Sequence, residues 1–101
     1  MIHALKTDPK FFEATAAGIK DFEVRKNDRP YQQGDYIALN EWDGEQYTGK
    51  FILQKIVYIL CDPEYCKEGY VTLGLKPCEM HCINDCDIAK GIRTGTSVYD
   101  R

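Results

Sequence analysis

Residues 51–60, FILQKIVYIL, are the most β-prone run in this chain of 101 residues. β-branched and aromatic side chains fill most of its positions, and these residue types suit the pleated, half-buried surface of a strand. The run is long enough to bend across a small barrel with both faces partly buried. We therefore expect a long strand here and look for its neighbours on either side.

The flanking segments predict further strands. After a loop containing Asp62-Pro63 and Lys67-Glu68-Gly69, the segment YVTLGL (70–75) is predicted as a last strand. On the other side, Asp43-Gly44 indicates a tight hairpin connection to the strand YIALNEW (36–42).

A helix is predicted near the N-terminus. Asp8 can cap it, and Pro9 suits the first helical position because its missing N–H has no partner there. Gly18 is placed to end the helix in a left-handed cap, after about three turns. The apolar stripe expected to dock the helix consists of Phe12, Ala16 and Ile19, flanked by Phe11 and Thr15.

The segment after this helix changes to a period of two. Phe22 and Val24 fall on one face, and Asp21, Glu23 and Arg25 fall on the other, which predicts a half-buried strand.

Residues 2–6 add a short strand, and turn-forming residues occupy 27–30 and 33–35. One main helix and about five closely spaced strands predict an α+β fold built as a small β-barrel.

Length and composition indicate one soluble domain. With 44% hydrophobic and 29% charged residues the chain differs from disordered sequences. No apolar run approaches the roughly 20 residues needed to span a bilayer, and the first residues lack the apolar middle of a secretory signal. We expect a cytoplasmic protein without a membrane partner. The net charge of −3 argues against tight, sequence-independent binding to long nucleic acids.

A change in amino-acid composition divides the chain at residue 76. Residues 1–76 are expected to form the folded domain, and residues 77–101 a cysteine-containing tail. The tail holds Cys78, Cys82 and Cys86 at a spacing of four, with His81 among them. Zinc sites usually pair their ligands as C-x-x-C, so this spacing favours free thiols, and we predict no metal and no cofactor.

The charged stretch GIKDFEVRKNDR (18–29) is the candidate functional segment. Glu23 and Arg25 share one face of the predicted strand, and Lys20 lies near the junction between helix and strand. The three side chains can bind a phosphate or the polar edge of a base. The alternative is a solvated strand face with weak ion pairs.

Other candidates surround this segment. Arg25, Lys26 and Arg29 make the only dense basic patch, and His3 and Lys6-Thr7 precede the helix where they can border the same cleft. Trp42, Tyr31 and Tyr47 are candidates to stack a base, although roles in the core or barrel rim are equally open.

The residue order resembles a known family. The pattern consists of HxLKTxPxFF, then GxKxFExRKNDRxYxxGD, then Glu41-Trp42-Asp43, Tyr47-Thr48-Gly49 and a YVxLG ending. Over about residues 2–75 it looks like the ASCH superfamily, and is most similar to the small DUF3850 type. The resemblance implies a PUA-like barrel that binds RNA in the cleft lined by the Gly-x-Lys-x-x-Glu-x-Arg segment. The residues expected to contact RNA or a modified nucleotide are Lys20, Glu23, Arg25, Lys26, Arg29, His3, Lys6 and Trp42.

The resemblance also carries an enzymatic alternative. Some small ASCH proteins are amidohydrolases that deacetylate N-acetylated cytidine with a lysine, a threonine and a distant glutamate. Their lysine matches Lys20, but Glu23 stands where their threonine lies. Lys20 and Glu23 are therefore the catalytic residues only if the protein is an enzyme. A protein-binding domain is the third hypothesis.

Overall fold

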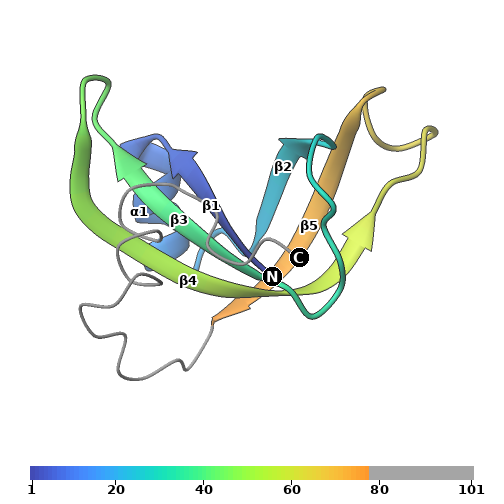
Figure 1. The fold of residues 1–101 in the computed structure, drawn as a ribbon, viewed down its shortest axis with the longest axis horizontal. Coiled ribbons are helices and arrows are strands. Elements are labelled where there is room, and N and C mark those ends of the chain that lie inside the picture. Colours follow the sequence, from blue (N-terminus) through green and yellow to red (C-terminus); the bar gives the residue numbers. More distant parts are fainter. Residues whose placement is uncertain (78–101) are drawn as a thin grey trace.

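The long strand β4 (Tyr47–Leu60) organises the fold in the computed structural model, which describes residues 1–77. Its first part pairs antiparallel with β3 (Tyr36–Trp42), and its last part pairs antiparallel with β5 (Tyr70–Pro77). A shift in register between Ile56 and Tyr58 lies within the β5 pairing. β4 is strongly curved and runs under both halves of the sheet (Figure 1), as its sequence predicts.

Two shorter strands complete the sheet at its edges. β1 (Ile2–Thr7) pairs parallel with β3, and β2 (Phe22–Lys26) pairs antiparallel with β5. The order is β1-β3-β4-β5-β2. Among residues 1–77 no strand pairing joins β1 to β2, so this part of the chain forms a curled half-barrel with β1 and β2 as its two open edges (Figure 1).

Apolar side chains from all the strands except β2 fill the inside of the half-barrel. The cluster consists of Leu5, Ile37, Leu39, Ile56, Val71, Leu73 and Leu75, with Tyr31 and Ile59 packed against it. A second small cluster, centred on Ile2 and Ala38, includes Tyr36, Phe51 and Leu53. Alternate residues of β1, β3 and β5 supply most of the first cluster, and the other face of β1 and β3 supplies Ile2 and Ala38 to the second.

The helix α1 (Pro9–Ala16) begins at the predicted proline but is shorter than expected, and it packs against β3 and β4. Its predicted docking stripe is partly wrong. Phe12 and Thr15 are buried, whereas Ala16 is exposed and Ile19 is 81% exposed. The chain leaves the helix at Gly18, where φ is +76°, so Ile19 lies beyond the helix and cannot continue its face.

The predicted boundary after residue 76 lies one residue before the last residue of β5, Pro77, and it stays a prediction. Cys78, Cys82 and Cys86, with the predictions made for the tail, lie outside the described residues. Within residues 1–77 the structure contains no helix that is long and apolar enough to span a membrane.

Candidate functional site

β2 turns its charged face, not its apolar face, into the half-barrel. Glu23 is only 5% exposed, whereas Phe22 and Val24 are 45% and 55% exposed. The prediction that Phe22 and Val24 form the buried face is therefore wrong. The pairing with β5 explains why Glu23 points inward. Glu23 lies opposite the fully buried Leu73, and residues opposite one another in a sheet share a face.

Glu23 is held between two cations. Lys20 Nζ donates to Glu23 Oε1 at 2.5 Å and also to the carbonyl oxygen of Phe22 at 2.6 Å. Arg25 Nε donates to Glu23 Oε2 at 3.0 Å. Both carboxylate oxygens are thus paired, which offsets the free energy that burying the charge would otherwise cost. The structure brings together the three residues that the sequence had suggested.

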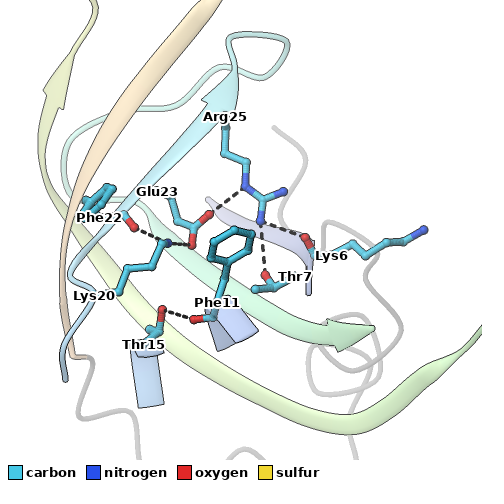
Figure 2. A network of polar contacts seen from close by, with 8 residues as sticks. All are labelled: Lys6, Thr7, Phe11, Thr15, Lys20, Phe22, Glu23 and Arg25. Atoms are coloured by element: carbon cyan, nitrogen blue, oxygen red, sulfur yellow. Dashed lines mark hydrogen bonds and ion pairs between the residues drawn. The ribbon is translucent and has the colours of Figure 1, made fainter. Parts of the chain in front are cut away.

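Arg25 also connects the two open edges of the half-barrel. From β2, its Nη2 donates to the carbonyl oxygen of Lys6 at 2.9 Å and to Thr7 Oγ1 at 3.3 Å, both on β1 (Figure 2). The guanidinium therefore bonds a carbonyl of a strand edge, and it does so with the fixed fork geometry that a lysine lacks.

A cleft of about 550 Å³ opens beside this cluster. It lies between the end of β1, the helix α1 and the strand β2. Its walls combine apolar and charged side chains. The lining residues are Lys6, Thr7, Asp8, Phe11, Lys20, Phe22, Glu23, Val24 and Arg25.

Two phenylalanines flank the lysine at the cleft. Lys20 Nζ lies 5.9 Å from the ring centroid of Phe11 and 5.1 Å from that of Phe22. Phe11 comes from α1 and Phe22 from β2, and both rings are partly exposed. An apolar surface next to paired charges is the composition expected of a small-molecule site.

His3 does not border this cleft. It is 1% exposed, and its Nε2 lies 2.8 Å from Asp35 Oδ2, with the His3 ring 4.7 Å from the Tyr31 ring. Desolvation by burial acts to raise the pKa of Asp35. Hydrogen bonds from His3, the Met1 ammonium and the backbone N–H of Gln32 outweigh it, so the pKa is lowered. His3 thus belongs to a second polar group inside the half-barrel.

Tyr31 lies between the two polar groups. It packs against the apolar core, and burial raises the pKa of its hydroxyl, while the positive charges of Arg29 and Arg25 act in the opposite direction. Arg29 is therefore near the phenol and half-buried, away from the lining of the cleft. Lys26 is exposed, opposite Tyr70 on the outer face of β2. The predicted patch of Arg25, Lys26 and Arg29 is not a single surface.

Lys6 and Trp42 contact each other beside the cleft. Lys6 Nζ lies 4.0 Å from the centroid of the Trp42 ring, and Trp42 contacts Tyr47 edge to face at 5.0 Å. Lys6 also lines the cleft, whereas Trp42 and Tyr47 do not.

Sequence reasoning missed part of the lining. The sequence predicts Phe11 beside the stripe that docks the helix, Phe22 on the apolar face of a half-buried strand, and Asp8 as a helix cap. Asp8 does precede α1, but no side-chain capping bond is formed. The alternation of β2 is symmetrical, so it cannot tell which face points inward. The useful indication was the spacing of Lys20 and Arg25 on either side of Glu23, because a buried carboxylate needs such partners.

Within residues 1–77 no group of three or more His, Cys, Asp or Glu side chains is arranged to hold a metal ion.

Comparison with known proteins places the chain in a family. The model of the family described as "Domain of unknown function (DUF3850)" matches residues 2–75. The chain belongs to the DUF3850 family. The match covers every described strand except the last two residues of β5, and it includes all the residues that line the cleft.

A relative of this DUF3850 protein occurs in Escherichia phage P2. It is the "Uncharacterized 12.9 kDa protein in GpA 3'region", 36% identical over 72 residues. The alignment covers 71% of the present chain and 65% of the phage protein, so the chain spans just under two thirds of that relative.

Proposed function

We propose that this DUF3850 protein binds a single nucleotide, free or within RNA, in the cleft between α1, β1 and β2. The observation that carries the proposal is Glu23, a buried carboxylate paired with both Lys20 and Arg25 in the lining of a 550 Å³ cleft. Clefts of about 300–1,000 Å³ with a few fixed polar groups are typical of small-ligand sites.

The unused hydrogen-bonding capacity of the cluster suits a base edge. Among residues 1–77, the hydrogen bonds of Lys20 use two of its three N–H groups, and those of Arg25 leave both hydrogens of Nη1 unused. A carboxylate has about four acceptor positions, so Glu23 can still accept from an amino group. Lysine and arginine donate to base carbonyls, and glutamate accepts from exocyclic amines. Phe11 and Phe22 supply aromatic surface for the base.

The charge of the cleft limits the ligand further. Its lining contains three cations (Lys6, Lys20 and Arg25) and two carboxylates (Asp8 and Glu23), so one net positive charge remains. Such a cleft suits a nucleoside or a single phosphate better than a polyphosphate chain. With a net charge of −3 on the whole protein, affinity for RNA is modest and falls as salt increases.

The fold that we propose is PUA-like, within the ASCH superfamily. A curled five-stranded half-barrel with a helix beside one open edge supports this assignment. The position of the charged cleft between that helix and the sheet supports it as well.

A second candidate function is hydrolysis of an acylated nucleoside such as N-acetylated cytidine. The direct Lys20–Glu23 contact favours it, because an adjacent lysine and carboxylate can exchange a proton beside a bound amide. Thr7 adds a hydroxyl to the cleft from β1, which partly replaces the threonine that is absent at position 23. In this reaction water adds to the acetyl carbonyl, the C–N bond breaks as the departing amine takes up a proton, and acetate is released.

The test is equilibrium binding of cytidine, N-acetylated cytidine and a short structured RNA at low salt. Lys20→Met should weaken binding at least severalfold, whereas Lys55→Met, on an exposed position of β4, should leave it unchanged. Binding that is absent, or equally affected by both substitutions, would reject the cleft. Release of acetate by the wild type but not by Lys20→Met would establish the enzymatic candidate.

A further inference from the structure

A second aromatic surface lies beside the cleft but outside its lining, and Lys6 contacts both. Its backbone carbonyl accepts from Arg25 inside the cluster, while its side chain runs away from that cluster (Figure 2). The ammonium ends 4.0 Å from the Trp42 ring centroid. One residue of β1 therefore connects the proposed nucleotide site with the turn end of the β3–β4 hairpin.

The second surface is held in place by the hairpin. Trp42 ends β3, Tyr47 begins β4, and the two residues are direct cross-strand partners. Their rings meet edge to face at 5.0 Å, and the neighbouring Glu41 accepts a hydrogen bond from Thr48 Oγ1 at 2.9 Å across the same hairpin. Trp42 is half-buried, so part of its ring system is accessible. A fixed and accessible indole is a suitable stacking surface for a base.

We propose that the ligand has at least two nucleotide units: one in the cleft, and an adjacent unit whose base stacks on Trp42, with Lys6 contacting the phosphate between them. This inference rests on the proposed function and identifies its ligand class as single-stranded RNA instead of a free nucleoside. The ammonium of Lys6 leaves the indole as the second base approaches, and exchanges a cation–π contact for a charge-assisted bond to phosphate.

The surrounding charges indicate how this second unit is bound. Glu41 and Asp43 are next to Trp42 in the chain, so the region does not attract phosphate strongly apart from Lys6. The added affinity therefore comes mainly from stacking. Truncating a stacking aromatic residue typically lowers affinity by about 5- to 150-fold.

Trp42 is the only tryptophan in the chain, so intrinsic tryptophan fluorescence reports on this surface alone. The test compares cytidine with a short single-stranded oligocytidylate, and follows the amide signals of the cleft and the fluorescence of Trp42 in parallel. We expect cytidine to shift the cleft amides without changing the fluorescence. The oligonucleotide should shift the same amides, change the fluorescence and bind more tightly.

Variants separate stacking from charge. Trp42→Leu should lower the ratio of oligonucleotide to cytidine affinity by about 5- to 150-fold. Tyr65→Leu, which removes an exposed aromatic ring from the loop before β5, should leave that ratio unchanged. Lys6→Met keeps most of the aliphatic stem and should reduce the salt dependence of oligonucleotide binding by about 0.7 in log–log slope.

The outcomes distinguish the two proposals. If cytidine shifts the cleft amides but the oligonucleotide neither binds more tightly nor changes the fluorescence, the second subsite is rejected and the nucleotide cleft remains. If neither ligand shifts the cleft amides, both proposals are rejected. If Trp42→Leu does not fold, an unchanged salt slope in Lys6→Met rejects the second subsite instead.

Discussion

The paired strands β2 and β5 contribute opposite kinds of side chain to the same inner face. β5 turns Val71, Leu73 and Leu75 inward, all at most 5% exposed. β2 turns Glu23 and Arg25 inward, and leaves Phe22 and Val24 outside. Apolar burial stabilises a fold, whereas burying charge costs free energy unless every charge is paired. β5 thus builds the core, while β2 carries a paired, buried charge that we propose serves ligand binding.

The opposite edge of the half-barrel shows a weaker form of the same contrast. β1 contributes Leu5 to the core, yet it also buries His3 and Thr7. His3 bonds Asp35, and Thr7 accepts from Arg25. Polar groups therefore occur inside the half-barrel at both open edges, where the apolar core ends.

The largest expected effect comes from a matched pair of valines. Val71→Ala removes two methyl groups from a 1% exposed position and should lower the free energy of unfolding by about 2 kcal/mol. Val24→Ala removes the same groups from a 55% exposed position on β2 and should change it by about 0.5 kcal/mol or less. Chemical denaturation measures both. Equal losses would mean that β2 is not inverted.

Glu23→Gln tests the charged half of the comparison. It keeps the shape of the side chain but removes the charge that pairs with Lys20 and Arg25, so we expect a loss of about 1–2 kcal/mol in unfolding free energy. Glu45→Gln, an exposed position in the hairpin, is the control and should have almost no effect. If Glu23→Gln leaves the free energy of unfolding unchanged, the carboxylate is solvated.

Asp35→Asn tests the polar group at the other edge. The pKa of Asp35 in the folded protein is lowered from 3.8, so its ionised form stabilises the fold. This contribution is complete above the unfolded pKa and is lost as the pH falls through the folded one. At neutral pH we expect the free energy of unfolding of the wild type to exceed that of Asp35→Asn by about 1 kcal/mol, after allowing for partial solvent screening.

The difference in unfolding free energy between the wild type and Asp35→Asn should become smaller below pH 3.8. Denaturation curves across this range measure it, with the exposed Asp21→Asn as control. A gap between wild type and Asp35→Asn that persisted at low pH would argue against the hydrogen bonds assigned to Asp35.

The smallest effect on stability is expected from Arg25→Lys. Lysine keeps the charge but cannot bond Glu23, the Lys6 carbonyl and Thr7 at once, so the two edges should separate more often. We expect a loss of about 0.5 kcal/mol, with faster amide hydrogen exchange in β1 and β2 but not in β5. Lys26→Arg, on the outer face, is the control. Unchanged exchange in β1 would disprove the bridging role of Arg25.

Much of the fold was predictable because local rules agree with the tertiary structure. The long strand at 51–60, the hairpin at Asp43-Gly44, the strand after Gly69 and the helix start at Pro9 all occur. What failed was the orientation of β2 and the length of α1. A period of two gives two equivalent faces, and only the pairing of β2 with β5 decides which one points inward.

The candidate site was predictable in its centre but not in its limits. Glu23 and Arg25 are two residues apart on β2, so strand geometry places them on one face, and Lys20 reaches Glu23 from just before the strand. Phe11, Thr7 and the Lys6 carbonyl reach the same cleft from other elements, which depends on how the half-barrel curls. His3 illustrates the reverse, since its neighbour Asp35 is distant in sequence and draws it into a different group.

The most direct test of the central claim is an NMR titration of isotope-labelled protein with cytidine and with a short structured RNA at low salt. The inverted strand is proposed to bind a nucleotide, so amide shifts should concentrate at residues 20–25, Thr7 and Phe11, and should be lost in Glu23→Gln but not in Glu45→Gln. If these amides do not shift under conditions where the protein is folded, the account is contradicted, and β2 is a charged edge without a ligand.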